Sequence, residues 1–238
     1  MSNGQSGFIK KGSLQGLEHY ADAQSNHSTD SPWYILFHGY GADAYDLFGL
    51  HDVTPVKKTL NWFCPQGPLS VHIGPGWTGR AWWNIDMLEI QRAATQGIER
   101  EFSNDKPPEL PSLREKVIAS IEKIAPWEQI ILGGFSQGAM LATDIYLHAP
   151  KTPRGLTILS GSLLNRPEWE PLVKNRQGEE FFMAHGKYDQ VLKYAGAQRL
   201  HQILTSGGML GTLNTFSGAH EIPANTIAQL GAYLTKKI

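Results

Sequence analysis

Few features of this sequence would link the chain covalently or hold it in a membrane. Its 238 residues contain one cysteine, Cys64, which excludes an intrachain disulfide. No apolar run is long enough to cross a bilayer, and the polar residues 1–7 lack the apolar core of a signal peptide. We therefore expect a cytoplasmic protein with no stable membrane insertion, in which Cys64 is a buried structural thiol.

An excess of charge of one sign is also missing. The formal net charge is −1 at pH 7, with 21 Lys and Arg against 22 Asp and Glu. Proteins that bind nucleic acid through its phosphates carry a basic patch or stripe. Adjacent lysines in this chain occur only as pairs, such as Lys10 and Lys11. Nucleic acid is therefore not an expected partner.

The chain length favours one domain, because 238 residues can bury a sizeable core without dividing. The sequence has no internal repeat and no stretch typical of a linker. We expect residues 1–12 to form a flexible N-terminus and residues 13–238 to form a single domain. Residues 13–23 alternate weakly in polarity, which fits an edge strand or a hairpin.

Apolar runs bounded by Gly and Pro alternate with segments of helical period. Residues 33–37 (WYILF) and 129–133 (QIILG) have the character of strands buried on both faces. Residues 112–124 repeat their apolar side chains with a period near that of a helix, and Ser112 with Glu115 fits a capping box at its start. Strands that alternate with helices predict an α/β fold with a mostly parallel central sheet and helices on both faces.

The remaining elements follow the same alternation. Further strands are expected at residues 60–65, 156–159, 181–184 and 210–216. Further helices are expected at residues 43–51, 86–102 and 194–205, from residue 139 and from about residue 223. Residues 66–79 are rich in Gly and Pro and are expected to form a loop. In open parallel sheets, ligands bind at the carboxyl ends of the strands.

Residues 134–138 (GFSQG) follow an expected strand and precede an expected helix. G-x-S-x-G in this setting is typical of the nucleophile elbow of α/β-hydrolases, where a tight turn strains the serine and glycines avoid clashes. The Ser136 hydroxyl would then lie at a helix N-terminus, whose N–H groups favour negative charge. The alternative is a Gly-rich turn with a bystander serine. A downstream acid followed by a histidine decides between the two.

His220 and Asp189 are the expected partners of Ser136, because a serine hydroxyl needs a base, and the base needs an acid to orient it. His220 lies between the last expected strand and the last helix, and Asp189 directly follows the strand at 181–184. The alternatives are a surface or capping histidine and a turn aspartate that caps the next helix. Other histidines after the elbow are less well placed: His148, His185 and His201.

An oxyanion hole needs two backbone donors. One is the N–H of Gln137, the residue after the expected nucleophile. The other is expected from residues 37–41 (FHGYG), where glycines let the backbone approach a ligand closely, and the N–H of Tyr40 is the candidate. We expect His38 to hold this loop by hydrogen bonds rather than to act as a second base.

Seven short segments together resemble the phospholipase/carboxylesterase family, which includes acyl-protein thioesterases and small bacterial carboxylesterases. They are residues 37–43 (FHGYGAD), 64–68 (CPQGP), 80–85 (RAWWNI), 133–139 (GGFSQGA), 159–161 (LSG), 185–189 (HGKYD) and 218–221 (GAHE). The resemblance implies an α/β-hydrolase fold with a minimal cap, no metal and no cofactor, and it allows a homodimer. It also implies catalytic Ser136, Asp189 and His220, with Tyr40 and Gln137 at the oxyanion hole.

Three features depart from that family without removing a catalytic group. Family members commonly have Leu where Tyr40 stands, so the larger ring would narrow the site while the backbone donor remains. Asn84 stands where family members often have Asp, which puts a charge-dependent role there in doubt. The proline usual shortly after the catalytic Asp is also missing from residues 191–192.

Apolar side chains near the expected site suggest its substrates. A cluster lies near the Gly/Pro-rich segment and consists of Trp77, Trp82, Trp83, Met87 and Leu88, and Leu163 and Leu164 follow the strand at 156–159. Trp82, Trp83, Leu163 and Leu164 are the expected substrate pocket, although each tryptophan fits a core or dimer position equally well. The predicted function is a serine carboxylesterase for small esters, lysophospholipid or acyl-thioesters. The alternatives are an acyl-protein thioesterase proper and a non-hydrolytic ligand-binding protein of the same fold.

Overall fold

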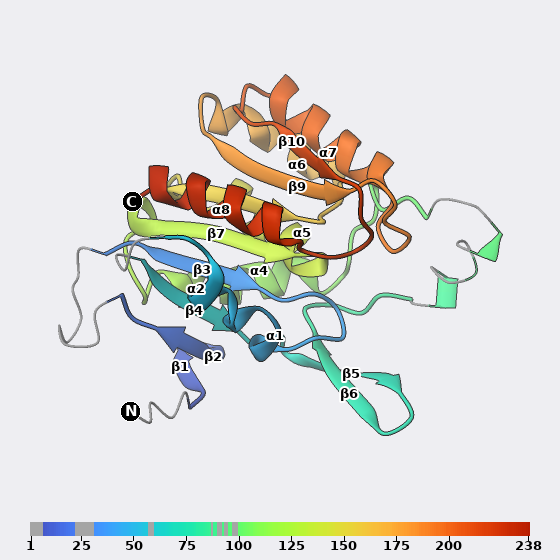
Figure 1. Ribbon diagram of the computed structural model, residues 1–238, viewed down its shortest axis with the longest axis horizontal. Coiled ribbons are helices and arrows are strands. Elements are labelled where there is room, and N and C mark those ends of the chain that lie inside the picture. The colour runs from blue at the N-terminus through green and yellow to red at the C-terminus, as the bar shows by residue number, and fades with distance from the viewer. Residues whose placement is uncertain are drawn as a thin grey trace.

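In the computed structural model, which describes residues 7–21, 31–56, 60–86, 88–89, 92, 95–96 and 100–238, one twisted sheet runs through the molecule (Figure 1). Within these residues the strand order is β1-β2-β4-β3-β7-β8-β9-β10. The strands span Ile9–Lys11, Leu14–His19, Asn61–Pro65, Trp33–Phe37, Ile130–Phe135, Gly155–Leu159, Phe181–Gly186 and Leu213–Phe216 in that order. The pairs β1–β2 and β2–β4 are antiparallel, and every other pair is parallel.

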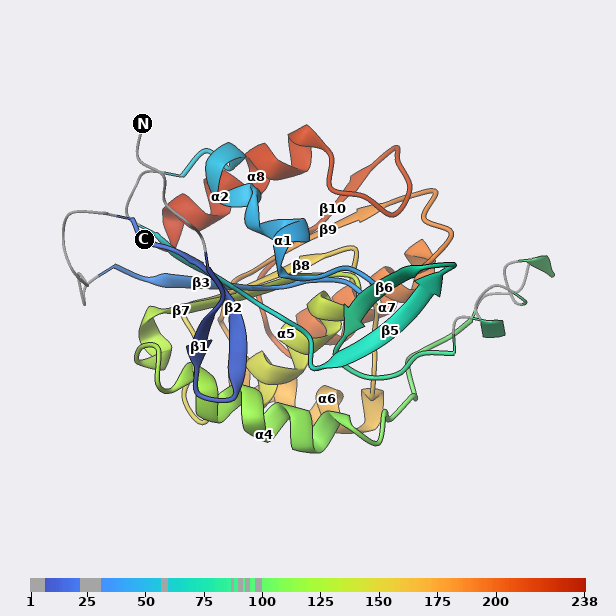
Figure 2. The ribbon, with the colours of Figure 1, turned by 90° about the horizontal axis from the view of Figure 1, so that it is seen from below.

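Helices cover both faces of this sheet (Figure 2). One face carries α4 (Leu110–Ile121), α5 (Gln137–His148), α6 (Arg166–Val173) and α7 (Tyr194–Ser206), and the other carries α1 (Ala44–Phe48), α2 (Leu50–Val53) and α8 (Ala224–Lys236). A separate hydrophobic cluster fills each side of the sheet. The prediction of an α/β fold with a mostly parallel sheet between two helical layers is confirmed.

The continuous apolar runs of the central strands follow from this double cover. In β3, Trp33, Ile35 and Phe37 belong to the cluster beneath α4 and α5. Tyr34 and Leu36 point to the opposite cluster with α1 and α8. Each buried side chain of this size stabilises the fold by about 1.5–3 kcal/mol. A polar residue at any of these five positions would therefore lose contacts on a face that water does not reach.

The N-terminal hairpin begins within residues 1–12, which were expected to be flexible. Ile9–Lys11 forms β1 and pairs with β2 from the register Ile9↔Gly16 to Lys11↔Leu14. The backbone N–H of Ser13 donates to Ser120 Oγ of α4 over 3.0 Å, which attaches the turn to the body of the domain. The prediction of a frayed chain is wrong for this strand, because pairing to an existing sheet edge supplies its backbone hydrogen bonds.

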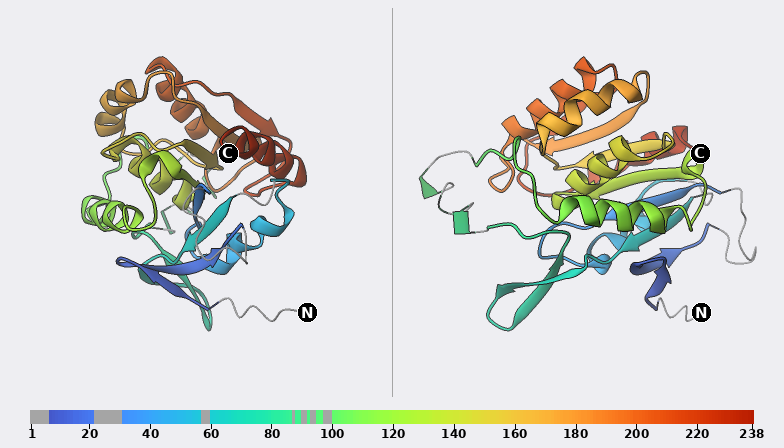
Figure 3. Two further views of the ribbon diagram at one scale, coloured as in Figure 1. Left: turned by 90° about the vertical axis from the view of Figure 1, so that its left-hand side faces the viewer. Right: turned by 180° about the vertical axis from the view of Figure 1, so that it is seen from behind.

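A second hairpin replaces most of the loop expected at residues 66–79. Strands β5 (Leu69–Gly74) and β6 (Trp77–Ala81) are antiparallel and project away from the central sheet (Figure 3). Gly79 is required for packing, since a Cβ there would lie 1.9 Å from the carbonyl oxygen of Gly41. Glycine at a close backbone approach looks the same in sequence as glycine in a loop, so the prediction was wrong here.

The helix boundaries also differ from the sequence pattern at two places. Helix α4 begins at Leu110 with Glu109 as its N-cap residue, and the Ser112 hydroxyl donates to the Glu109 carbonyl over 3.1 Å instead of capping. Helix α6 was not predicted, because Pro171 lies inside it and its apolar content is low. Of the 17 residues at 86–102, where a helix is expected, eight lie outside the described residues.

Candidate active site

Ser136 occupies the turn between β7 and α5 in a backbone conformation that side chains rarely adopt, with φ 56° and ψ −120°. The turn is possible because its flanking glycines lack Cβ atoms. A Cβ on Gly134 would lie 2.2 Å from the Gly138 backbone, and one on Gly138 would lie 2.0 Å from the Phe37 carbonyl oxygen. The structure therefore places the expected nucleophile on a strained strand-to-helix turn.

The loop after β3 lies directly beside Ser136. A Cβ on Gly39 would be 3.3 Å from the Ser136 Cβ, so the backbone directly before Tyr40 borders the serine. The N–H of Gly41 donates to the Arg80 carbonyl over 2.8 Å, which fixes the far end of this loop to β6. The amide of Gln137 is the first of α5, where a helix leaves its N–H groups without intrahelical partners.

His38 holds the loop after β3 in place by hydrogen bonds. The N–H of Gly67 donates to His38 Nε2 over 2.9 Å, so the neutral ring carries its proton on Nδ1 and donates it to the Gly39 carbonyl over 2.7 Å. The Trp82 indole N–H donates to the His38 carbonyl over 2.8 Å. His38 thus has the contacts of a structural residue, as its sequence position suggested.

This histidine should make stability depend on pH. Burial lowers the pKa of His38 from 6.5 to about 4. Between these values the unfolded chain binds a proton that the folded chain does not, so stability falls as the pH drops through this window, by about 3 kcal/mol in total. Urea unfolding at pH 7 and pH 5 measures this loss.

The control for that experiment is His38→Gln, which keeps an acceptor near Gly67 but cannot titrate. Its stability should change less between pH 7 and pH 5 than that of the wild type. An equal pH slope in both proteins would contradict the assignment.

Asp189 and His220 form a close pair. His220 Nδ1 lies 2.6 Å from Asp189 Oδ2, and the N–H groups of Val191 and Leu192 donate to Asp189 Oδ1 over 2.8 and 2.9 Å. Burial opposes the charged form of Asp189, but the hydrogen bonds from His185 and His220 outweigh it and hold the pKa of that carboxyl well below its usual range. A carboxylate on Nδ1 leaves the Nε2 lone pair of His220 free to accept a proton.

His185 also contacts the expected acid, although its sequence position before Asp189 pointed away from a role. Its ring is fully buried, and Nε2 lies 2.7 Å from the Leu192 carbonyl and 3.3 Å from Asp189 Oδ2. The sequence signal that could have found it is the i,i+4 spacing from His185 to Asp189 across the end of β9. His148 and His201 lie away from the site. The ring of His148 is hydrogen-bonded to Glu168, and that of His201 to the Gly211 carbonyl.

Ser136 and His220 line one cavity of about 500 Å³. Its other walls come from the loop after β3, the first turn of α5 and the segment after Asp189. They are formed by Gly39, Tyr40, Gly41, Ala42, Asp46, Ile85, Phe102, Phe135, Gln137, Met140, Val191 and Leu192. We refer to this space as the catalytic cavity.

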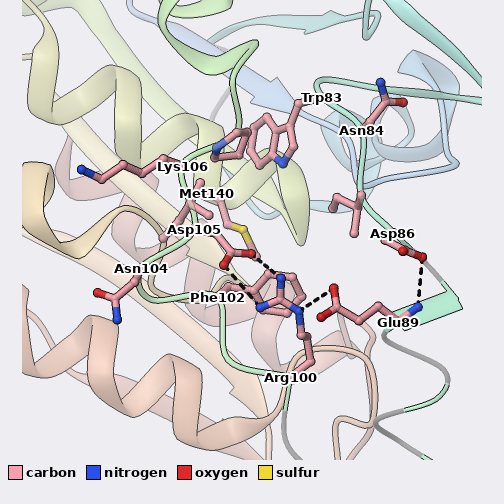
Figure 4. Close-up of a pocket in the computed structure, with 13 residues that line it drawn as sticks. Trp83, Asn84, Asp86, Glu89, Arg100, Phe102, Asn104, Asp105, Lys106 and Met140 are labelled. Carbon is pink, nitrogen blue, oxygen red and sulfur yellow. Dashed lines mark hydrogen bonds and ion pairs between the residues drawn. The ribbon is translucent and has the colours of Figure 1, made fainter.

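The residues expected to form the substrate pocket lie in other places. Trp83 and Leu164 line an adjoining cavity of about 430 Å³, which shares Ile85, Phe102 and Met140 with the catalytic cavity (Figure 4). Trp82 and Leu163 are buried and line neither cavity. Trp77 and Leu88 are exposed, and Met87 lies outside the described residues.

The side chain of Gln137 explains why Trp82 is fixed. Gln137 Oε1 accepts from the Trp82 N–H over 3.0 Å, and Gln137 Nε2 donates to the Trp83 carbonyl over 2.8 Å. The sequence interpretation assigned a role only to the backbone of Gln137. Its buried amide also holds the tryptophan segment against the start of α5.

Among the described residues, no group of three His, Cys, Asp or Glu side chains could hold a metal ion. No helix in the described part of the chain is long and apolar enough to span a bilayer.

Comparisons with known proteins show the family and the fold. The model of the phospholipase/carboxylesterase family matches residues 19–238. The chain is 27% identical over 222 residues to acyl-protein thioesterase 1 homolog 1 of Dictyostelium discoideum, which covers 90% of this chain and 94% of that protein. Its fold matches esterase PE8 with a TM-score of 0.70 at 22% identity, covering 94% of this chain and 99% of that chain. It matches the Bacillus cereus carboxylesterase with a TM-score of 0.68 at 15% identity, covering 95% of each.

Proposed function

Because this chain belongs to the phospholipase/carboxylesterase family and is a hydrolase of the esterase and thioesterase type, we propose that Ser136, His220 and Asp189 are its nucleophile, base and acid. The observation that carries this proposal is the shared cavity. Ser136, with its strained backbone at the end of β7, and His220 both line it, and the buried carboxylate of Asp189 holds Nδ1 of His220.

The proposed reaction proceeds through an acyl-enzyme. His220 Nε2 removes the proton from the Ser136 hydroxyl, and the resulting alkoxide attacks the carbonyl carbon of the substrate. The N–H groups of Tyr40 and Gln137 stabilise the oxyanion that forms. His220 then gives the proton to the departing alcohol or thiol. In the second half, His220 removes a proton from a water molecule, which attacks the carbonyl carbon of the acyl-enzyme. The Ser136 oxygen then leaves and regains its proton from His220, which releases the acid.

The proposed substrates are small carboxylic esters and acyl-thioesters. The apolar side of the catalytic cavity, formed by Ile85, Phe102 and Met140, supports binding of an acyl chain. Lysophospholipid is a further candidate substrate, and an acylated protein is one by analogy with the curated relatives, which are named acyl-protein thioesterases. No cofactor enters the proposed steps.

Covalent labelling tests the proposal directly. A fluorophosphonate should phosphonylate the protein at one site, and peptide mass spectrometry should locate the added mass on Ser136. Prior incubation with a short-chain p-nitrophenyl ester should slow the labelling. Labelling at another serine, or none in a protein that still hydrolyses esters, would refute the assignment.

The alternative is a ligand-binding protein that kept the fold without its activity. Such a protein would bind an ester in the catalytic cavity without releasing an acid. The close pair of Asp189 and His220 favours hydrolysis, since a binding protein has no need of an oriented base. Absence of both labelling and turnover in the folded protein would favour this alternative.

Two finer expectations belong to the same proposal. We propose that the chain from β1 onward forms one domain, because the hairpin β1–β2 is attached to both the sheet and α4. A reducing, cytoplasmic location is supported by the single, buried Cys64.

A further inference from the structure

Asp46 is an acidic side chain in a catalytic cavity that is otherwise mainly apolar. It lies in the first turn of α1, which follows the loop that carries the Tyr40 amide, and it lines the same cavity as Ser136. Of the residues that line this cavity, Asp46 is the only one with a carboxylate, and none is a lysine or an arginine. A substrate bound at Ser136 therefore meets one fixed negative charge.

The charge of Asp46 is not matched by a partner. Within the described part of the chain, no hydrogen bond or ion pair engages its carboxylate, whereas the neighbouring Asp43 caps α1 by accepting from the Tyr45 N–H over 2.9 Å. Asp46 is exposed to solvent on one side, yet partial desolvation, and then the negative charge of Asp43, raise the pKa of Asp46 above its ordinary value, which is the direction expected for a carboxylate without a cation nearby.

The adjoining cavity does not offer the missing cation. Its guanidinium, Arg100, is held by Asp105 at 2.7 Å and by Glu89 at 3.0 Å (Figure 4). Its other cation, Lys106, is exposed to solvent. Among the described residues that line these two cavities, an anionic substrate would therefore find no fixed positive charge beside Asp46, and its own charge would be repelled.

A bare carboxylate beside the reaction site also has a kinetic consequence. The attack of Ser136 creates an oxyanion, and a nearby negative charge opposes the growth of that charge. A cation on the substrate would offset this effect while it pairs with Asp46. The arrangement is thus unfavourable for neutral and anionic esters and favourable for cationic ones.

We propose that Asp46 is a specificity-determining residue that selects esters or thioesters carrying an ammonium or guanidinium group a few bonds from the scissile carbonyl. This inference rests on the proposed function, because it assumes that the cavity at Ser136 binds the substrate. It adds the charge of the substrate to the ester class already proposed.

Matched pairs of substrates test the proposal. In one pair the leaving thiol ends in trimethylammonium or in its neutral isostere, tert-butyl. In the other pair the acyl group of a p-nitrophenyl ester ends in the same two groups. For each pair the ratio of kcat/KM, cationic over neutral, is measured in the wild type, in Asp46→Asn and in Asp52→Asn. Asp52 is exposed on α2 and does not line the cavity, so its variant controls for the change of net charge.

In at least one pair, the ratio should fall about two- to fivefold in Asp46→Asn, as expected for a solvent-accessible ion pair. The ratio should hold in Asp52→Asn, and the wild-type ratio should decrease at high salt. The pair that responds shows whether the cation lies on the acyl or the leaving side. Unchanged ratios in Asp46→Asn for both pairs, while neutral esters are still hydrolysed, would overturn the inference alone. No hydrolysis of any ester by the wild type would instead refute the proposed function.

Discussion

Replacing Ser136 by alanine should lower the turnover of a p-nitrophenyl ester about a millionfold, to the level that substrate binding and the oxyanion hole sustain by themselves. The expected loss is this large because the nucleophile, the base and the acid act as a unit. Without the hydroxyl no acyl-enzyme can form, whatever the state of Asp189 and His220. The measurement is steady-state hydrolysis over a range of enzyme concentrations high enough to detect the residual rate.

The folded state should tolerate this change. Ser136 Oγ makes no hydrogen bond to the described residues, and alanine would meet the same backbone strain at φ 56°. The melting temperature should therefore stay near that of the wild type, which separates a chemical loss from unfolding. Activity within tenfold of the wild type would contradict the nucleophile assignment.

Ser160 provides a matched control for Ser136. It lies at the end of the adjacent strand β8, is buried, and also has a positive φ of 47°. Its backbone N–H donates to the Ala184 carbonyl, as that of Ser136 donates to the Leu159 carbonyl, each over 2.9 Å. Ser160 does not line the catalytic cavity. Ser160→Ala should retain most of the activity, so a loss confined to Ser136→Ala cannot be ascribed to strain at a strand end.

Asp189→Asn should lower kcat about 10⁴-fold, because it would force His220 into the wrong tautomer. The backbone N–H groups of Val191 and Leu192 both donate to Asp189 Oδ1, so the amide oxygen of asparagine must take that position. The amide NH₂ then faces His220 Nδ1, which has to become an acceptor. The proton moves to Nε2, and the ring can no longer take a proton from Ser136.

The tautomer change gives this prediction a direct readout. The ring nitrogen signals of His220 in an NMR spectrum should exchange their protonated and unprotonated character between the wild type and Asp189→Asn. His185 favours the same result, since its Nε2–H already points to the Leu192 carbonyl beside the acid and cannot accept from the new amide. The matched control is Asp52→Asn, in which an exposed carboxylate is neutralised away from the site. A loss of less than tenfold would show that Asp189 is not the orienting acid.

The sequence alone determined the central sheet and the elements that carry the chemistry. Strand β3 and helix α7 match their predicted ranges closely. A continuous apolar run and a helical period both indicate which residues are buried, and both can be read directly from the sequence. The residues of the elbow were equally clear. The turn itself requires glycine at position 134, where a Cβ would meet the Gly138 backbone, whereas Gly138 is required by the Phe37 carbonyl oxygen of the neighbouring strand.

The tertiary structure decided what distant segments do to one another. Gln137 holds the backbone at Trp82 from a position 55 residues away, and no local pattern announces that contact. Likewise Trp82 is part of the core and Phe102 is a wall of the catalytic cavity, because packing sets which apolar side chains face Ser136. The sequence fixes which residues are apolar, strained or able to titrate. Only packing decides which of them share a cavity, and packing places the carboxylate of Asp46 in the same cavity as Ser136.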